Sequence, residues 1–173
     1  MNHPPDQLLL LTCNNAATIL AEYSGDVAIM TLAAPATTML PHALPSCTNA
    51  RILLFAVRRM GAHGLHDAAA AHMMLDAFGQ DFRRPLLLVR NLMADLAAHA
   101  SGTIAIAPCC CARMTPAESA LLTILARIET TPITARFLLS DLLGARRVDG
   151  VLASAAIVAA AFADAGRPIG ERG

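Results

Sequence analysis

The sequence lacks lysine and tryptophan altogether, and it holds only one tyrosine and five phenylalanines among its 173 residues. β-Sandwiches and β-barrels depend on aromatic and β-branched side chains, so this shortage disfavours an all-β fold. Charged residues are also scarce, at 15% of the chain, while hydrophobic residues reach 55%. Because much of that hydrophobic fraction is alanine, which lets helices pack closely, the composition favours an all-α protein.

An excess of positive charge is absent as well, since 13 basic residues balance 13 acidic ones. Nucleic-acid-binding domains usually carry a basic surface, so we expect no nucleic-acid partner. The longest apolar runs, around residues 27–36 and 151–163, are shorter than the roughly 20 residues that a membrane-spanning helix needs. The N-terminus also lacks the basic region of a signal peptide. We therefore expect a cytoplasmic protein without a membrane span, where cysteines stay reduced unless they do redox or metal chemistry.

The familiar catalytic motifs are missing too. The chain contains no Walker A or G-x-G-x-x-G phosphate loop, no H-E-x-x-H zinc-protease helix and no G-x-S-x-G nucleophile turn. No two carboxylates are spaced for hydrolysis. The sequence therefore does not indicate an enzyme.

The first part of the chain is organised differently from the rest. Half of the ten prolines fall between Pro4 and Pro45, and no apolar stripe of helical period persists there. We predict a poorly organised N-terminal extension at residues 1–44, a helical domain at 45–168 and a tail at 169–173. Residues 1–38 of the extension are predicted to be dispensable.

Beyond the extension, apolar residues recur with a helical period and are interrupted by capping and breaking residues. They predict a compact bundle of about six short helices, with one short extended segment at Thr103–Ala107 before a cysteine-rich loop. The clearest helix start combines Thr115 as N-cap, Pro116 at the first helical position and Glu118 completing a capping box. The expected helices run from about Ala50 to Met60, Leu65 to Phe78, the Asp81–Pro85 segment to His99, Pro116 to Glu129, Pro132 to Leu143 and Arg147 to Asp164.

Two of these helices carry expectations about individual side chains. In the first helix, Arg58 and Arg59 are expected on the solvent side, opposite an apolar face. In the fifth helix, Phe137, Leu138 and Leu142 are expected to be buried.

The most unusual feature is the run Cys109-Cys110-Cys111, in the loop just before the capping box. Thiolates act as nucleophiles and bind soft metals, so the run is a candidate site for zinc or another soft transition metal, or for thiol redox chemistry. In extended backbone the side chains of Cys109 and Cys111 point the same way and that of Cys110 points the opposite way. Cys109 and Cys111 would therefore share one metal ion. The remaining metal ligands would be histidines from nearby helix ends, namely His99, or His63 with His66.

Plainer interpretations of the same residues stay open. Free cysteine often acts as a small filler residue, and the spacing is not the C-x-x-C of zinc modules. The two histidines near Asp67 would then face solvent, with that aspartate capping the following helix. His99 lies on the predicted apolar stripe of its helix, which favours a place at the edge of the core.

Two classes of function follow from these patterns. The first is a metal- or thiol-redox-responsive protein that acts through the cysteine loop. The alternative is a helical interaction or regulatory module with structural cysteines, whose alanine-rich helix at 147–164 packs against a partner protein or a second copy of the chain.

Two stretches together resemble a small uncharacterised family of alphaproteobacterial proteins. The resemblance covers about residues 40–168 and implies a compact helical domain, while it brings no activity, cofactor or site residue. The stretches that carry it are Asn49-Ala50-Arg51-Ile52-Leu53-Leu54-Phe55 with Arg58-Arg59-Met60-Gly61-Ala62-His63-Gly64, and Ala107-Pro108-Cys109-Cys110-Cys111 with Arg113-Met114-Thr115.

Overall fold

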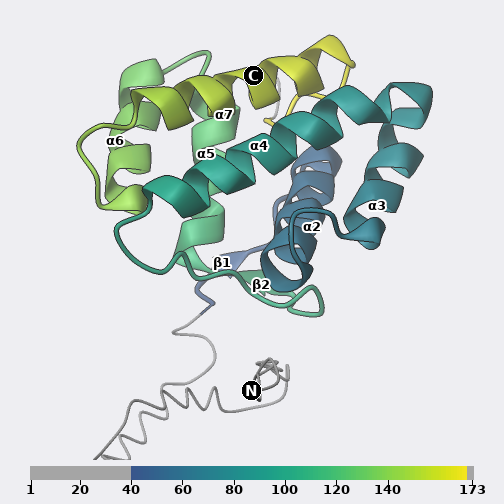
Figure 1. Cartoon of the computed structure of the whole chain (residues 1–173), viewed down its shortest axis with the longest axis horizontal. Helices are drawn as coiled ribbons and strands as arrows, with labels where there is room; N and C mark the ends of the chain where they lie inside the picture. Colours follow the sequence, from purple (N-terminus) through teal and green to yellow (C-terminus); the bar gives the residue numbers. More distant parts are fainter. Residues whose placement is uncertain (1–39, 171–173) are drawn as a thin grey trace, which may run out of the picture.

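The computed structural model describes residues 40–170, and this part of the chain is mostly helical (Figure 1). Six α-helices follow one another through short connections, with one 3-10 helix among them, in agreement with the predicted all-α bundle. The helices are α2 (Thr48–His63), α3 (Ala68–Phe78), η1 (Gly79–Phe82), α4 (Arg83–His99), α5 (Pro116–Arg127), α6 (Pro132–Leu143) and α7 (Asp149–Asp164).

Local signals explain where most of these helices begin and end. α2 continues through Gly61, beyond the predicted end at Met60, and stops at Gly64, whose φ of 93° suits only glycine well. α3 starts later than predicted because Asp67 caps it, accepting a hydrogen bond from the Ala70 amide at 2.8 Å. α6 has the bounds that its sequence predicted.

The strands in residues 40–170 are two short ones, β1 (His42–Ala43) and β2 (Arg113–Met114), which pair antiparallel. β2 follows the cysteine loop, whereas we predicted an extended segment before the loop, at 103–107. Residues 103–107 are assigned neither helix nor strand, and β1 pairs with β2.

The described contacts of the bundle include residues on both sides of the predicted helical domain at 45–168. The Arg113 guanidinium donates hydrogen bonds to the carbonyls of Leu40, at 2.7 Å, and Pro41, which ties the predicted extension to β2. At the other end Ile169, assigned to the tail, is buried in the core. Residues 1–38 lie outside the described part of the chain, so their dispensability stays a prediction.

α4 and α7 lie side by side along one side of the bundle (Figure 1). They run antiparallel, since Arg84 at the start of α4 pairs with Asp164 at the end of α7 and Ser154 donates to Asp95 at 2.5 Å. α7 therefore uses part of its alanine-rich surface inside the chain, where close helix packing needs small side chains. The buried alanines of α7 are Ala155, Ala159 and Ala161.

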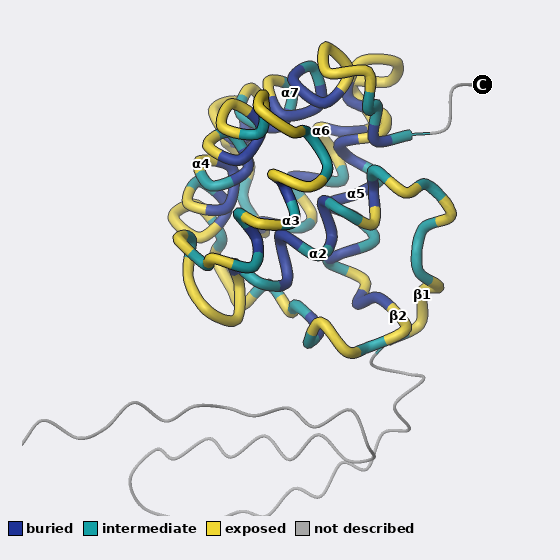
Figure 2. Tube along the Cα trace, turned by 90° about the vertical axis from the view of Figure 1, so that its right-hand side faces the viewer, coloured by how far each residue is buried: buried dark blue, intermediate teal, exposed yellow. Residues whose placement is uncertain are grey.

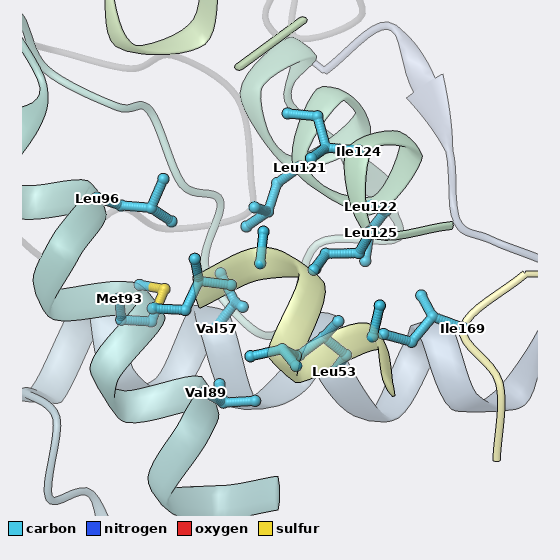
Figure 3. Packing of buried hydrophobic residues seen from close by; sticks show 14 of the residues in the cluster. Leu53, Val57, Val89, Met93, Leu96, Leu121, Leu122, Ile124, Leu125 and Ile169 are labelled. Carbon is cyan, nitrogen blue, oxygen red and sulfur yellow. The ribbon is translucent and has the colours of Figure 1, made fainter. Parts of the chain in front are cut away.

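The core is formed mainly by helix faces that turn toward one another, while most residues of the connections are exposed or half-buried (Figure 2). Phe162 of α7 is fully buried, and its ring meets that of Phe78 edge to face with centroids 4.9 Å apart. Leu53 from α2 and Leu122 and Leu125 from α5 pack in the same cluster (Figure 3). Across residues 40–170, every helix falls short of the length and apolarity that crossing a bilayer requires.

Candidate functional site

The capping box at the start of α5 is the first element of the site, and it is confirmed. The Glu118 amide donates to the Thr115 hydroxyl at 3.0 Å, and the Thr115 amide donates back to Glu118 Oε2 at 2.9 Å. The Thr115 hydroxyl also donates to the Ala105 carbonyl at 2.8 Å. These bonds fix the end of the loop relative to α5.

Glu118 has a second partner that the sequence did not indicate. Arg58 of α2 forms a two-pronged ion pair with it, with Nε to Oε1 at 2.8 Å and Nη2 to Oε2 at 2.9 Å. The two side chains are 4% and 0% exposed. Our expectation that Arg58 faces solvent is therefore wrong, because α2 turns this position toward α5 and a buried carboxylate there satisfies its charge.

The remaining hydrogen bonds of this pair hold both ends of the cysteine loop. Arg58 donates through Nη1 to the Cys111 carbonyl at 2.8 Å and through Nη2 to the Arg113 carbonyl at 2.7 Å. Glu118 Oε1 also accepts from the Ala107 amide at 3.0 Å. Each carboxylate oxygen thus receives two hydrogen bonds, so the pair is suited to holding backbone in place and has no lone pair left for acid–base chemistry.

Within the loop, the Cys111 amide donates to the Pro108 carbonyl at 3.0 Å and closes a turn. Cys109 is exposed at the tip of this turn and is not in a disulfide. Partial burial of its sulfur raises the pKa of Cys109, and the nearby charges of Arg59 and Arg58 offset only part of the rise. A raised pKa lowers the fraction of thiolate near neutral pH, which disfavours an activated nucleophile.

The predicted histidine ligands are not gathered at the loop. His99 is exposed, and its Nδ1 lies 2.8 Å from the Asp95 carbonyl of its own helix, so the expected place at the edge of the core is wrong. His63 and His66 are exposed at the connection between α2 and α3. Within residues 40–170, no three histidine, cysteine or acidic side chains are placed to hold one metal ion. The predicted metal site therefore gains no support from the described residues.

The polar cluster between α2 and α3 is instead organised by Asp67. Besides capping α3, as predicted, its carboxylate binds Arg59 through Nε at 3.0 Å and Nη2 at 2.7 Å. The Arg59 guanidinium holds the pKa of Asp67 below its usual value, with the Ala70 amide acting in the same direction and burial opposing it. The cluster joins the end of one helix to the start of the next.

The outer face of α6 carries the least expected side chains. Ile133 and Phe137, four residues apart, are 72% and 71% exposed. We predicted Phe137 to be buried, and this is wrong because α6 buries Ala135, Leu139 and Leu143, a face displaced by two residues. Two large apolar side chains thus lie next to each other in contact with water.

Comparisons with known proteins add one finding. No curated protein and no solved structure matches the chain significantly. The sequence pattern of a family of unknown function, DUF6628, matches residues 30–158, and the chain therefore belongs to that family.

Proposed function

We propose that this chain is a helical protein-interaction module, acting in the cytoplasm, whose contact surface is the outer face of α6. The observation that supports this proposal is the exposure of Ile133 and Phe137, at 72% and 71%, on one face of that helix. Single exposed hydrophobic residues are common on monomers, whereas neighbouring large ones mark contact surfaces. A phenylalanine buries about 150–250 Å² when covered, so this pair would supply the apolar centre of an interface.

A second copy of the chain is the partner that we propose. When two α6 helices pack antiparallel about a two-fold axis, the spacing of four residues brings Ile133 of each copy against Phe137 of the other. The surface is thus complementary to itself. The formal net charge of zero also means that two copies have no net charge repulsion to overcome.

This assignment moves the interaction surface from the alanine-rich helix at 147–164 to α6. α7 packs extensively on α4, which uses its inner face. The outer face of α7 carries Ile157, which is half exposed. We propose this face as a secondary contact surface.

Sedimentation velocity over a range of protein concentrations tests the proposal. We expect a reversible dimer for the parent chain and at least tenfold weaker dimerisation for the Ile133→Ser/Phe137→Ser variant. Leu87→Ser is the matched control, because Leu87 is also exposed but lies on α4. A parent chain that stays monomeric at every concentration, or a double variant as dimeric as the parent, would overturn the proposal.

A metal- or thiol-redox-responsive role of the cysteine loop is the second proposal. What supports it is the exposed thiol of Cys109 at the tip of the loop turn, which is not in a disulfide. Metal analysis of protein purified without a histidine tag, repeated on Cys109→Ser/Cys111→Ser, tests the metal form. The rate of disulfide exchange at Cys109 against pH tests the thiol form. Absence of bound metal, together with no measurable disulfide exchange at Cys109, would remove this proposal.

A further inference from the structure

A pocket of about 240 Å³, open to solvent on one side, lies beside the buried ion pair, between four helices and the segment that leads into the cysteine loop. Val57 from α2, Met93 and Leu96 from α4, and Leu121 from α5 surround this space (Figure 3). Ile104 and Ile106 from the segment before the loop close another side. The walls therefore come from parts of the chain that are far apart in sequence.

The lining of the cavity has one charged side chain, and it is already neutralised. Glu118 lies on the wall with its side chain fully buried, and its two oxygens accept from Arg58, the Ala107 amide and the Thr115 amide. No hydrogen-bonding capacity is left to bind a polar group. A charged or strongly polar guest would lose its hydration without a replacement, which is costly in such surroundings.

The cavity stays open because several of its lining residues are small. Gly61 lies inside α2, where alanine would favour the helix by roughly 1 kcal/mol. A Cβ at this position would come within 3.0 Å of Ile106 Cδ1, so the glycine allows the loop segment to approach the helix. The other small residues on the walls are Ala97, Ala100, Gly102 and Ala117.

We propose that this cavity is a binding site for an uncharged, apolar small molecule. The space opens to solvent beside Ala97 and Gly102, which are exposed, and its lining is almost entirely apolar, so an apolar guest can enter it and leave water. A cavity of about 150 Å³ lined by aliphatic side chains is known to bind benzene, and scaling by volume gives a guest of roughly ten non-hydrogen atoms. The site is independent of the α6 surface, so either proposal can fail alone.

Naphthalene, with ten carbon atoms, is the probe, and 2-naphthoate is the matched charged control. Methyl NMR spectra of the full chain are recorded with each compound. We expect naphthalene to shift the methyl signals of Ile104, Ile106 and Leu121 in a saturable way. The charged naphthoate leaves them unchanged, because the wall offers no group to neutralise it.

Two variants locate the site. Ala97 lies on the cavity wall and is itself exposed, so Ala97→Phe obstructs the cavity without altering the core. Ala94→Phe places the same side chain on the exposed surface of α4, outside the lining. We expect at least tenfold weaker naphthalene binding for Ala97→Phe and unchanged binding for Ala94→Phe. Gly102→Leu, where an added Cβ meets open space, is a second obstructing variant if Ala97→Phe unfolds. Absence of saturable shifts, or equal binding by obstructed and control variants, would overturn the proposal.

Discussion

Replacing Glu118 by glutamine removes the negative charge of the ion pair that holds the cysteine loop while keeping the size of the side chain. The guanidinium of Arg58 is then left buried without a counter-ion. The new amide group also presents a donor where Arg58 and two backbone amides already donate. Breaking a buried ion pair by removing one partner costs about 3–5 kcal/mol. Since domains unfold with free energies of about 5–15 kcal/mol, this single change should remove a large part of the total.

Urea unfolding followed by circular dichroism measures that loss. The matched control is Asp164→Asn, which breaks the pair between Arg84 and Asp164 at the α4–α7 contact. Those side chains are 66% and 61% exposed, so water already solvates both charges and the expected cost is below about 1 kcal/mol. If Glu118→Gln proved no more destabilising than Asp164→Asn, the assignment of the buried pair as the main support of the loop would be refuted.

The double variant Arg58→Met/Glu118→Gln separates the cost of an unpaired buried charge from the cost of losing the hydrogen bonds to the loop carbonyls. It removes the uncompensated charge, so it should be more stable than the sum of the two single changes allows. It does not regain the stability of the parent, because the Cys111 and Arg113 carbonyls lose their donors in every variant without Arg58. Full recovery would mean that those carbonyl bonds contribute nothing.

Four other variants test the remaining structure. Leu139→Ala should cost about 2–5 kcal/mol in urea unfolding, whereas Phe137→Ala on the exposed face of the same helix should change stability by less than about 0.5 kcal/mol at dilute concentration. Asp67→Asn keeps the helix cap but loses the charge pair with Arg59. Because folding lowers the pKa of Asp67, its contribution is complete above the ordinary aspartate pKa and disappears as the pH falls through the lowered value. The Tm difference between this variant and the parent should therefore be present at neutral pH and vanish in strong acid. Gly144→Ala should lose about 1–2 kcal/mol, since this residue has a φ of 60°, and a thermal scan would detect it.

The parts of the fold that could be predicted are those encoded by neighbouring residues. The capping box of Thr115 and Glu118 depends on four consecutive residues, and both of its hydrogen bonds are present. The signals that set the bounds of α6, Pro132 at its start and Gly144 after its end, are also local. The chain belongs to a family of unknown function, which agrees with the uncharacterised status of the family that the two stretches resemble, while the match does not bear on the alphaproteobacterial source.

The ion pair at the loop could not be predicted because its partners are 60 residues apart. Arg58 stands four residues after buried Leu54, which is the spacing of a core position. A charged residue normally marks the solvent-facing side of a helix, so the residue type predicted exposure although the spacing fits the buried face. Only the packing of α2 against α5 places the carboxylate of Glu118 there.

The exposed face of α6 illustrates a different limit of sequence reasoning. The helix has apolar residues on more than one side, so its period allows several faces to be buried. Packing against α5 selects the face of Ala135, Leu139 and Leu143. Ile133 and Phe137 are therefore left exposed. No local feature of the sequence shows which apolar face of α6 is buried and which is exposed.

The beginning of α2 and the segment after α7 are held together directly. Asn49 Nδ2 donates to the Pro168 carbonyl at 3.0 Å, and the Cys47 thiol points to the same oxygen at 3.8 Å. The two ends of the helical region are therefore in direct contact with each other. We expect a circular permutant that joins these ends through a short linker and opens the exposed turn at Thr130 to retain every helix pairing, which would show that the packing does not depend on the order in which the helices are synthesised.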